Sequence, residues 1–295
     1  MQISKSQTGF LLPLCFIILY GSGFTATKYG LQNISPMAFL LIRFFIAFIL
    51  LVIIAYYLKV SWPKNLREYI HIAVAGSLTV AVFSIGVFVS IDLGVSPSLN
   101  ALIIALQPAL VTILARNVLR EKITKKHWLG LMIGFIGVAF VVLSKFDFSH
   151  DISYGIFMSI FALFGLSLGS LYQKKYCSNM NLFSGGAVQT LASALLVLPL
   201  MFVYEEVRFN FNADLVYAIL YMAVAVSIGA LSLLYIMIDK GEVSKVSSIF
   251  YLIPVCAVVM SYLFFGEEID LNIVIGVMAV LLGISLINKR EKQSE

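Results

Sequence analysis

Polar side chains inside long apolar stretches are the residues of this sequence that could do chemistry. Arg43 follows Pro36 by seven residues, which places it roughly 10 Å into an apolar stretch at about 1.5 Å per residue. An arginine at that depth costs about 2.5–3.5 kcal/mol on insertion scales, so it usually faces the protein interior or a watery cavity. Such a cation is suited to bind an anionic group of a small molecule. A guanidinium that snorkels or caps nearby carbonyls is the alternative.

Five further residues are candidates for contacting the same small molecule. Asn100 and Gln107 are seven residues apart and therefore share one helix face. They either line a path or tie two helices together, because amides buried in lipid need partners. Gln189 and Tyr251 lie deep within their apolar stretches and are candidates for lining a cavity. Lys28 ends the first stretch, where both substrate contact and snorkelling fit.

Carboxylates are missing from the middle of the apolar stretches, where proton-coupled carriers often place one. All fifteen Asp and Glu residues lie at the ends of these stretches, between them or in the tails. If protons drive the activity, Asp92 and Asp239 are the best candidates. A process without deep protonation is equally allowed.

Motifs of catalysis and metal binding are also missing. The sequence contains no HExxH, GxSxG or P-loop pattern and no cluster of His and Asp. Its three cysteines, Cys15, Cys177 and Cys256, lie far apart and have no metal-ligand spacing. We therefore expect no enzyme, no cofactor and no bound metal.

The elements that position these residues are membrane-spanning helices. Of the 295 residues, 61% are hydrophobic and 12% are charged, against about 25% charged in a soluble domain. A spanning helix takes about 20 apolar residues, so ten helices use most of the chain. The sequence predicts an all-α membrane protein with spans at residues 9–28, 36–58, 69–91, 97–115, 127–144, 153–173, 181–204, 215–238, 244–265 and 271–288.

Lysine and arginine predict how the spans are oriented. Sixteen of the twenty basic residues fall in the tails and loops on the side of the N-terminus, and only Lys28, Lys145 and Arg208 fall on the other side. Because cytoplasmic loops carry an excess of Lys and Arg, both termini are expected in the cytoplasm. The basic residues form no single patch, so the net charge of +5 does not indicate binding to nucleic acid.

The chain contains an internal repeat, which predicts one five-helix unit at residues 1–145 and a second at 146–295, including a short cytoplasmic tail. The matched residues are Asp92-Leu93-Gly94, Pro108, Glu121, Gly130 and Gly137, which recur as Asp239-Lys240-Gly241, Pro254, Glu267, Gly276 and Gly283. From Pro108 onward the offset is 146 residues, and at this offset Arg43 matches Gln189 and Lys28 matches Lys174. An odd number of spans inverts the second half, and inverted-repeat transporters bind substrate between their halves.

Small residues form a stripe on the last span of each half. Gly130, Gly134 and Gly137 share one face of the fifth span, and Gly276, Ala279 and Gly283 repeat the pattern on the tenth. Small residues let helix backbones approach closely. The stripes predict packing between the halves or a homodimer contact.

Three stretches resemble the EamA-domain family of the drug/metabolite transporter superfamily. They are Tyr20-Gly-Ser-Gly-Phe-Thr-Ala-Thr-Lys28, the segment from Asp92 through Pro108 to Arg120-Glu121, and the segment from Asp239 through Pro254 to Gly266-Glu267. The resemblance covers nearly the whole chain. Arg120-Glu121 departs from the family's usual Gly-Glu, which the second half keeps at Gly266-Glu267.

The resemblance implies ten helices in two inverted repeats around a central cavity, and a transport function. The leading hypothesis is a secondary transporter that exports a small polar metabolite, with amino acids as the commonest theme, by alternating access. An uptake carrier or exchanger for a nucleotide-like or other metabolite, and a membrane protein with a structural role, are the alternatives. The expected partners are the small-molecule substrate and the lipid bilayer, and the expected location is a bacterial-type plasma (inner) membrane.

Overall fold

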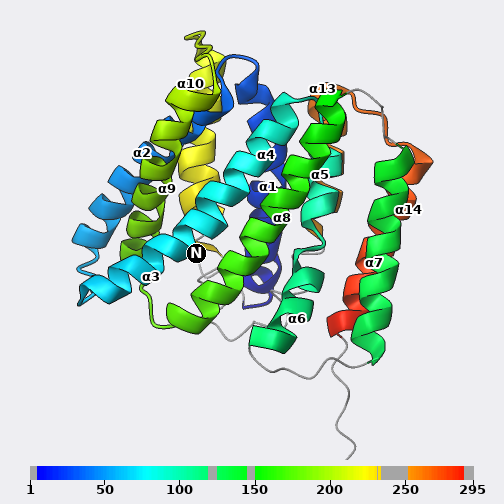
Figure 1. Ribbon diagram of the computed structural model, residues 1–295, viewed down its shortest axis with the longest axis horizontal. Coiled ribbons are helices and arrows are strands. Elements are labelled where there is room, and N and C mark those ends of the chain that lie inside the picture. Colours follow the sequence, from blue (N-terminus) through cyan, green and yellow to red (C-terminus); the bar gives the residue numbers. More distant parts are fainter. Residues whose placement is uncertain (1–4, 119–124, 145–149, 231, 234–251, 289–295) are drawn as a thin grey trace, which may run out of the picture.

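The described part of the chain is mostly helical, and each of the ten predicted spans overlaps at least one described helix (Figure 1). Residues 234–251, which include the end of the eighth predicted span and the start of the ninth, lie outside the described residues. The computed structural model describes residues 5–118, 125–144, 150–230, 232–233 and 252–288. The first half contains α1 (Lys5–Leu31), α2 (Pro36–Tyr57), α3 (Leu66–Gly76), η1 (Ser77–Val82), α4 (Phe83–Asp92), α5 (Pro97–Ile104), α6 (Gln107–Val118) and α7 (Lys125–Ser144). The second half contains α8 (His150–Tyr176), α9 (Leu182–Tyr204), α10 (Ala213–Leu220), η2 (Tyr221–Ala230), α13 (Ile253–Phe265) and α14 (Leu271–Asn288).

Length and hydropathy confirm that this is an all-α membrane protein. Within the described ranges, five continuous helical stretches are each long and apolar enough to cross a bilayer: Pro36–Tyr57, Leu66–Asp92, Asp151–Tyr176, Leu182–Tyr204 and Ala213–Ala230. Shorter apolar helices occupy Pro97–Val111, Trp128–Leu143, Ile253–Phe265 and Leu271–Gly283. The third span is continuous from α3 through η1 to α4, as the sequence predicts.

Helix starts follow from residues that satisfy the first free backbone N–H groups. The Asn65, Asn181 and Asn212 side chains each accept a hydrogen bond from a backbone amide in the first turn of the helix they precede. Ser96 caps α5 in the same way, and Pro97 occupies its first turn, where no N–H is needed. The local sequence thus fixes where α3, α9, α10 and α5 begin.

The fourth predicted span is two helices and not one. α5 ends at Ile104, and α6 begins at Gln107, directly before Pro108. Proline has no N–H to donate and its ring clashes with the preceding turn, which favours a break at this position. The equivalent Pro254 lies in the first turn of α13.

The two halves interleave. α1 packs against η2 and α13 of the second half, while α8 packs against η1, α4 and α6 of the first half. The repeat-related helices α2 and α9 pack on each other, and so do α7 and α14, which stand side by side at one edge of the molecule (Figure 1). Each half therefore completes the other, and the centre of the bundle is built from both.

Four loops meet at one end of the bundle, here called the Lys28 end: residues 32–35, 93–96, 205–212 and 266–270. The Ser35 amide donates to the Arg208 carbonyl at 3.1 Å, and the Asn210 amide donates to the Asn33 carbonyl at 2.8 Å. Glu205 accepts hydrogen bonds from the Ser35 hydroxyl and from two backbone amides at the start of α2. These four loops are among those that the charge pattern assigns to the side opposite the N-terminus.

The glycine stripes pack α7 directly against α14. A Cβ on Gly137 would lie 2.3 Å from the Ala279 Cβ, and a Cβ on Gly283 would lie 2.4 Å from the Gly130 carbonyl oxygen. Packing between the halves, one of the two predictions from these stripes, is therefore what the glycines provide. The homodimer contact stays a prediction.

We expect Gly137→Ala to lower the free energy of unfolding by about 1–3 kcal/mol relative to Gly134→Ala. Both changes raise helix propensity, but only the Cβ at position 137 overlaps a neighbour, because a Cβ on Gly134 meets nothing closer than Leu106 at 3.5 Å. Thermal unfolding in detergent measures the difference. Equal midpoints for the two variants would contradict this account of the α7–α14 contact.

Candidate functional site

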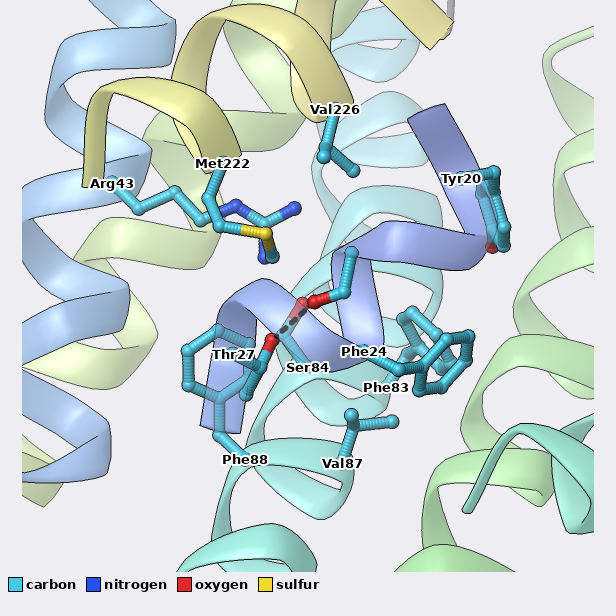
Figure 2. A pocket seen from close by; sticks show the side chains of 11 residues that line it. Tyr20, Phe24, Thr27, Arg43, Phe83, Ser84, Val87, Phe88, Met222 and Val226 are labelled. Carbon is cyan, nitrogen blue, oxygen red and sulfur yellow. Dashed lines mark hydrogen bonds between the residues drawn. The ribbon is translucent and has the colours of Figure 1, made fainter. Parts of the chain in front are cut away.

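A cavity lies between α1, α2 and α4 of the first half and η2 of the second half (Figure 2). Its volume is about 60 Å³ in this conformation, which is below the range of about 300–1,000 Å³ that is typical of small-molecule sites. Its described lining residues are Tyr20, Gly23, Phe24, Thr27, Arg43, Phe83, Ser84, Val87, Phe88, Met222 and Val226.

One face of α1 forms a wall of this cavity. Tyr20, Gly23, Phe24 and Thr27 are spaced i, i+3, i+4 and i+7, so they share that face. The Thr27 hydroxyl donates to the Gly23 carbonyl at 2.8 Å, which leaves its oxygen lone pairs available as acceptors. η2 packs close to this face, since a Cβ on Gly23 would be in van der Waals contact with Val226 at 3.4 Å.

Arg43 extends from α2 into the cavity. Its Nε donates to the Ser227 hydroxyl of η2 at 3.1 Å. Its guanidinium carbon lies 5.9 Å from the centre of the Phe88 ring and 5.8 Å from that of Phe44, within the range of cation–π contacts. Figure 2 shows the guanidinium beside Met222, with its terminal nitrogens directed away from α2. The residue singled out by sequence therefore does face a cavity between the halves.

The π-helical geometry of η2 holds Ser227 in position. The Ser227 hydroxyl donates to the carbonyl of Met222, five residues earlier, at 2.9 Å. With its proton used in this bond, the oxygen is left to accept from Arg43. Short π segments inside helices are frequent at functional sites. Shifting η1 by the 146-residue repeat offset places it within η2, so the irregularity occurs in both halves.

Arg43 has no carboxylate partner among the residues that the structure describes. The ion pairs found there join Lys28 to Glu267 and Arg208 to Asp92, both at the Lys28 end. The terminal nitrogens of Arg43 thus keep donors that no described side chain occupies. An anionic ligand would supply the missing acceptors.

Lys28 follows the cavity residue Thr27 but does not line the cavity. Its Nζ pairs with Glu267 at 2.9 Å and lies 4.5 Å from the centre of the Phe265 ring. The Ser98 hydroxyl donates to the other oxygen of the same carboxylate at 2.9 Å. This ion pair ties α1 and α5 of the first half to the α13–α14 loop of the second.

One of the two proton-coupling candidates, Asp92, is not among the residues that line the cavity. Asp92 ends α4 at the surface and accepts from an Arg208 nitrogen with both carboxylate oxygens, at 2.7 and 2.9 Å. Asp239 lies outside the described residues, as does the substrate-binding candidate Tyr251.

The three amide candidates lie in helix contacts outside the described cavity lining. Gln107 donates to the Ser170 hydroxyl at 3.4 Å and so joins α6 to α8. Gln189 donates to the Gln173 side chain at 3.0 Å and joins α9 to α8. Asn100 is fully buried in α5, and neither its amide nitrogen nor its oxygen has a hydrogen-bond partner. Of the six substrate-binding candidates from sequence, Arg43 lines this cavity.

The cavity also contains residues that sequence reasoning did not select. Thr27, Ser84 and Met222 line it, and so does Tyr20, which as a tyrosine near a span end is compatible with an interfacial role. The signal for Tyr20 and Thr27 is their helical spacing within the Tyr20–Lys28 stretch. No comparable signal marks Met222, because its place in the cavity depends on how the two halves pack.

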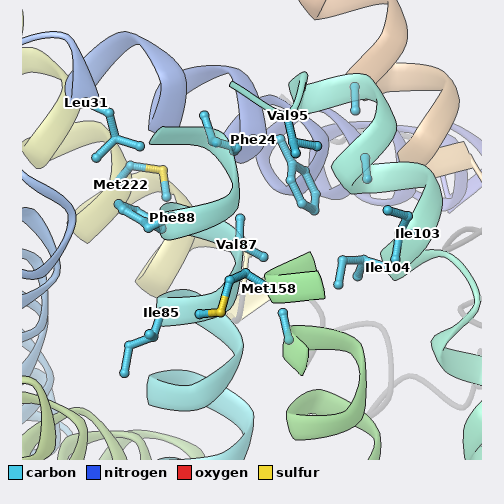
Figure 3. Close-up of a cluster of buried hydrophobic side chains, with 14 of the residues drawn as sticks. Phe24, Leu31, Ile85, Val87, Phe88, Val95, Ile103, Ile104, Met158 and Met222 are labelled. Atoms are coloured by element: carbon cyan, nitrogen blue, oxygen red, sulfur yellow. The ribbon is translucent and has the colours of Figure 1, made fainter. Parts of the chain in front are cut away.

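The cavity borders the main apolar core of the molecule (Figure 3). Phe24, Val87, Phe88 and Met222 belong both to the cavity wall and to this core, where Met158 of α8 also packs. The core thereby fixes the cavity walls, and it is built from helices of both halves.

Two groups of apolar helices that enclose a cavity with a partly buried cation are typical of a membrane transporter. A family comparison agrees with this class. The model of the EamA-like transporter family matches residues 7–143 and again residues 153–289. The chain belongs to the EamA-like transporter family.

Individual relatives cover nearly the whole chain. "Uncharacterized transporter YvbV" of Bacillus subtilis is 28% identical and covers 99% of this chain and 94% of its own length. A "Probable amino-acid metabolite efflux pump" of Escherichia coli is 20% identical and covers 95% of this chain and 94% of its own length. A solved crystal structure, 16% identical, superposes with a TM-score of 0.68 over 96% of each chain, which shows a shared fold.

We expect Arg43→Met to keep or raise the thermal midpoint of the ligand-free protein by a few degrees. The change removes an insertion cost of about 2.5–3.5 kcal/mol and loses one hydrogen bond worth about 1 kcal/mol, while Ser227 keeps its bond to Met222. Thermal unfolding in detergent measures this, with Lys64→Met, at an exposed position, as the control. A midpoint several degrees lower for Arg43→Met would assign the guanidinium a structural role.

Proposed function

We propose that this transporter exports a small polar metabolite, derived from amino-acid metabolism, across the plasma membrane by alternating access. The observation that carries the proposal is Arg43, a cation in a cavity between the halves with no described carboxylate partner. The printed name of the Escherichia coli relative supports efflux and the substrate class. The excess of Lys and Arg in loops on the N-terminal side supports cytoplasmic termini, which makes the Lys28 end extracytoplasmic.

Alternating access requires that one end of the cavity closes while the other opens. In this conformation the Lys28–Glu267 ion pair and the Ser98–Glu267 hydrogen bond hold the Lys28 end together across the two halves. Gly266, in the left-handed region at φ 62°, ends α13 and turns the chain toward Glu267. We assign this ion pair as a latch of the extracytoplasmic end.

Unpartnered polar groups support the view that the helices under this latch separate during transport. In the described residues, the buried side-chain atoms with no hydrogen-bond partner belong to Thr25, Asn100 and Ser261. These residues lie on α1, α5 and α13, and each pair of these helices is in contact. A buried polar group without a partner costs about 1–3 kcal/mol. Hydration in an open conformation would recover that cost.

We expect Arg43→Ala to reduce flux of the native substrate by at least about tenfold while the protein still inserts and expresses. The change removes charge-assisted hydrogen bonds to the substrate, each worth about 1.5–3 kcal/mol. Flux into or out of proteoliposomes measures this, after a metabolite screen of overexpressing cells identifies candidates. Lys64→Ala removes an exposed charge and serves as the matched control.

Normal flux through the Arg43→Ala variant would remove Arg43 from the site. Two further outcomes bear on the function itself. Net uptake or obligatory exchange would favour the alternative of an import carrier or exchanger. A panel of amino acids, nucleosides and organic cations that gives neither flux nor thermal stabilisation would favour a structural role.

We expect the Lys28 end to be open in a larger fraction of molecules of the Glu267→Gln variant. The reporter is a Thr27→Cys variant whose native Cys15, Cys177 and Cys256 are replaced by serine. Its modification by a membrane-impermeant maleimide added outside the cell should become at least about threefold faster when Glu267 loses its charge, because an ion pair of about 1 kcal/mol is lost.

Glu268→Gln is the matched control for the latch, since Glu268 is the adjacent exposed carboxylate. Equal labelling rates in the Glu267 and Glu268 variants would rule out the latch. Labelling of the cysteine at position 27 only from the cytoplasmic side would contradict the proposed orientation and place the Lys28 end in the cytoplasm.

A further inference from the structure

We infer that the ligand of the Arg43 cavity is an organic monoanion: a carboxylate joined to an apolar, preferably aromatic, body that carries no ammonium group. The inference rests on the proposed function, which makes this cavity the substrate site. It goes further in excluding free α-amino acids as the preferred substrate. Three features of the cavity carry it.

The first feature is the orientation of the guanidinium. Arg43 Nε is engaged by Ser227 at 3.1 Å, and Ser227 is itself held by the Met222 carbonyl at 2.9 Å. The edge formed by the two terminal nitrogens is then the part of the fork left for a ligand. This edge matches the two oxygens of a carboxylate, which it binds with two parallel hydrogen bonds.

The second feature is the apolar wall around that edge. Phe24, Phe83, Val87, Phe88 and Val226 line the cavity and offer only carbon atoms from their side chains. Sites of this kind bury the body of a ligand against aromatic and aliphatic groups and orient it with a few polar ones. The wall accordingly favours a hydrocarbon or aromatic group attached to the bound carboxylate, and the cavity widens from about 60 Å³ to admit a ring.

The third feature is the charge balance. None of the described residues that line the cavity is acidic, and the polar side chains beside Arg43 are the neutral hydroxyls of Tyr20, Thr27 and Ser84. The ammonium of an α-amino acid sits two bonds from its carboxylate carbon. It would therefore lie close to the guanidinium with no described countercharge, and like charges in a poorly hydrated site repel each other strongly.

A monoanion also fits better than a dianion. Arg43 is the one cation among the described lining residues. A single carboxylate neutralises it, whereas a phosphate dianion would leave an unpaired negative charge in the cavity. The same guanidinium binds both groups, so the experiment includes both.

The experiment is a matched ligand series on the purified full-length protein. 3-Phenylpropanoate, phenylalanine, 3-phenylpropylamine, 3-phenylpropanol and phenylethyl phosphate share one aromatic body and differ in the charged or polar group. Binding is measured by thermal stabilisation over a range of ligand concentrations, and flux is measured in proteoliposomes. We expect 3-phenylpropanoate to bind at least about tenfold more tightly than each of the other four.

Variants then test whether the preference for the carboxylate depends on the Arg43 guanidinium and on Ser227. Arg43→Gln should abolish the preference for the carboxylate, and Ser227→Ala should weaken carboxylate binding severalfold while leaving alcohol binding unchanged. Ser227→Thr keeps a hydroxyl and should restore the carboxylate affinity. Lys64→Gln, which removes a charge far from the lining residues, should change nothing.

The outcomes separate this inference from the proposed function. Tighter binding of phenylalanine, the amine or the phosphate overturns the substrate class while leaving the carrier intact. The substrate class is also overturned, and the carrier kept, if cells that express the protein export a metabolite while the purified protein binds none of the five compounds. If Arg43→Gln leaves the affinity for the carboxylate unchanged, the Arg43 guanidinium is not its binding group. Carboxylate binding without any flux supports the ligand class and contradicts the carrier.

Discussion

The constraint that organises the cavity is a guanidinium placed in the membrane interior, where the hydrogen bond from Arg43 of the first half to Ser227 of the second sets its direction. An isolated guanidinium at this depth is unfavourable, and the protein offsets only part of that cost with one hydroxyl and two aromatic rings. The hydroxyl is available as an acceptor because the π-helical turn of η2 brings Ser227 onto the Met222 carbonyl. A helix irregularity in the second half thus sets the direction of a cation from the first half.

Sequence predicted the spans and Arg43 because both depend on local properties. Hydropathy and the charge asymmetry define the spans, and depth within one span singles out Arg43. Contacts between the halves are non-local, so the partners of these residues could not be predicted. The sequence predicts either substrate contact or snorkelling for Lys28, whereas its partner Glu267 lies 239 residues away. Gln107 and Gln189 are as polar as cavity residues, but each donates a hydrogen bond to a side chain of α8 and so joins two helices. Val226 and Met222 join the cavity because η2 of the second half packs against α1 of the first.

Residues that correspond in the two halves of the repeat differ in their chemistry. At the 146-residue offset, Thr27 and Arg43 correspond to Gln173 and Gln189. The first pair lines the cavity, and the second pair bonds to itself at 3.0 Å. Gly76 packs against Gln189 so closely that a Cβ would lie 2.5 Å from its backbone. In the second half, two neutral amides therefore bond to each other at the position where the first half has a cation that faces the cavity. Among the described residues, the cavity between the halves thus has one cation, Arg43, which suits a carrier for one small ligand.

The lack of a carboxylate partner for Arg43 among the described residues also bears on how a carrier of this kind would cycle. Moving between conformations requires the cavity to close and lose water, and a guanidinium without a countercharge resists dehydration. A bound carboxylate cancels the charge and supplies acceptors for the terminal nitrogens, so closure is easier for the loaded protein than for the empty one. Differential stabilisation of this kind is what a ligand needs in order to shift a conformational equilibrium. The same cation that selects the ligand would then couple its binding to the release of the latch at Lys28 and Glu267, because α1 carries both the cavity wall and one side of that ion pair.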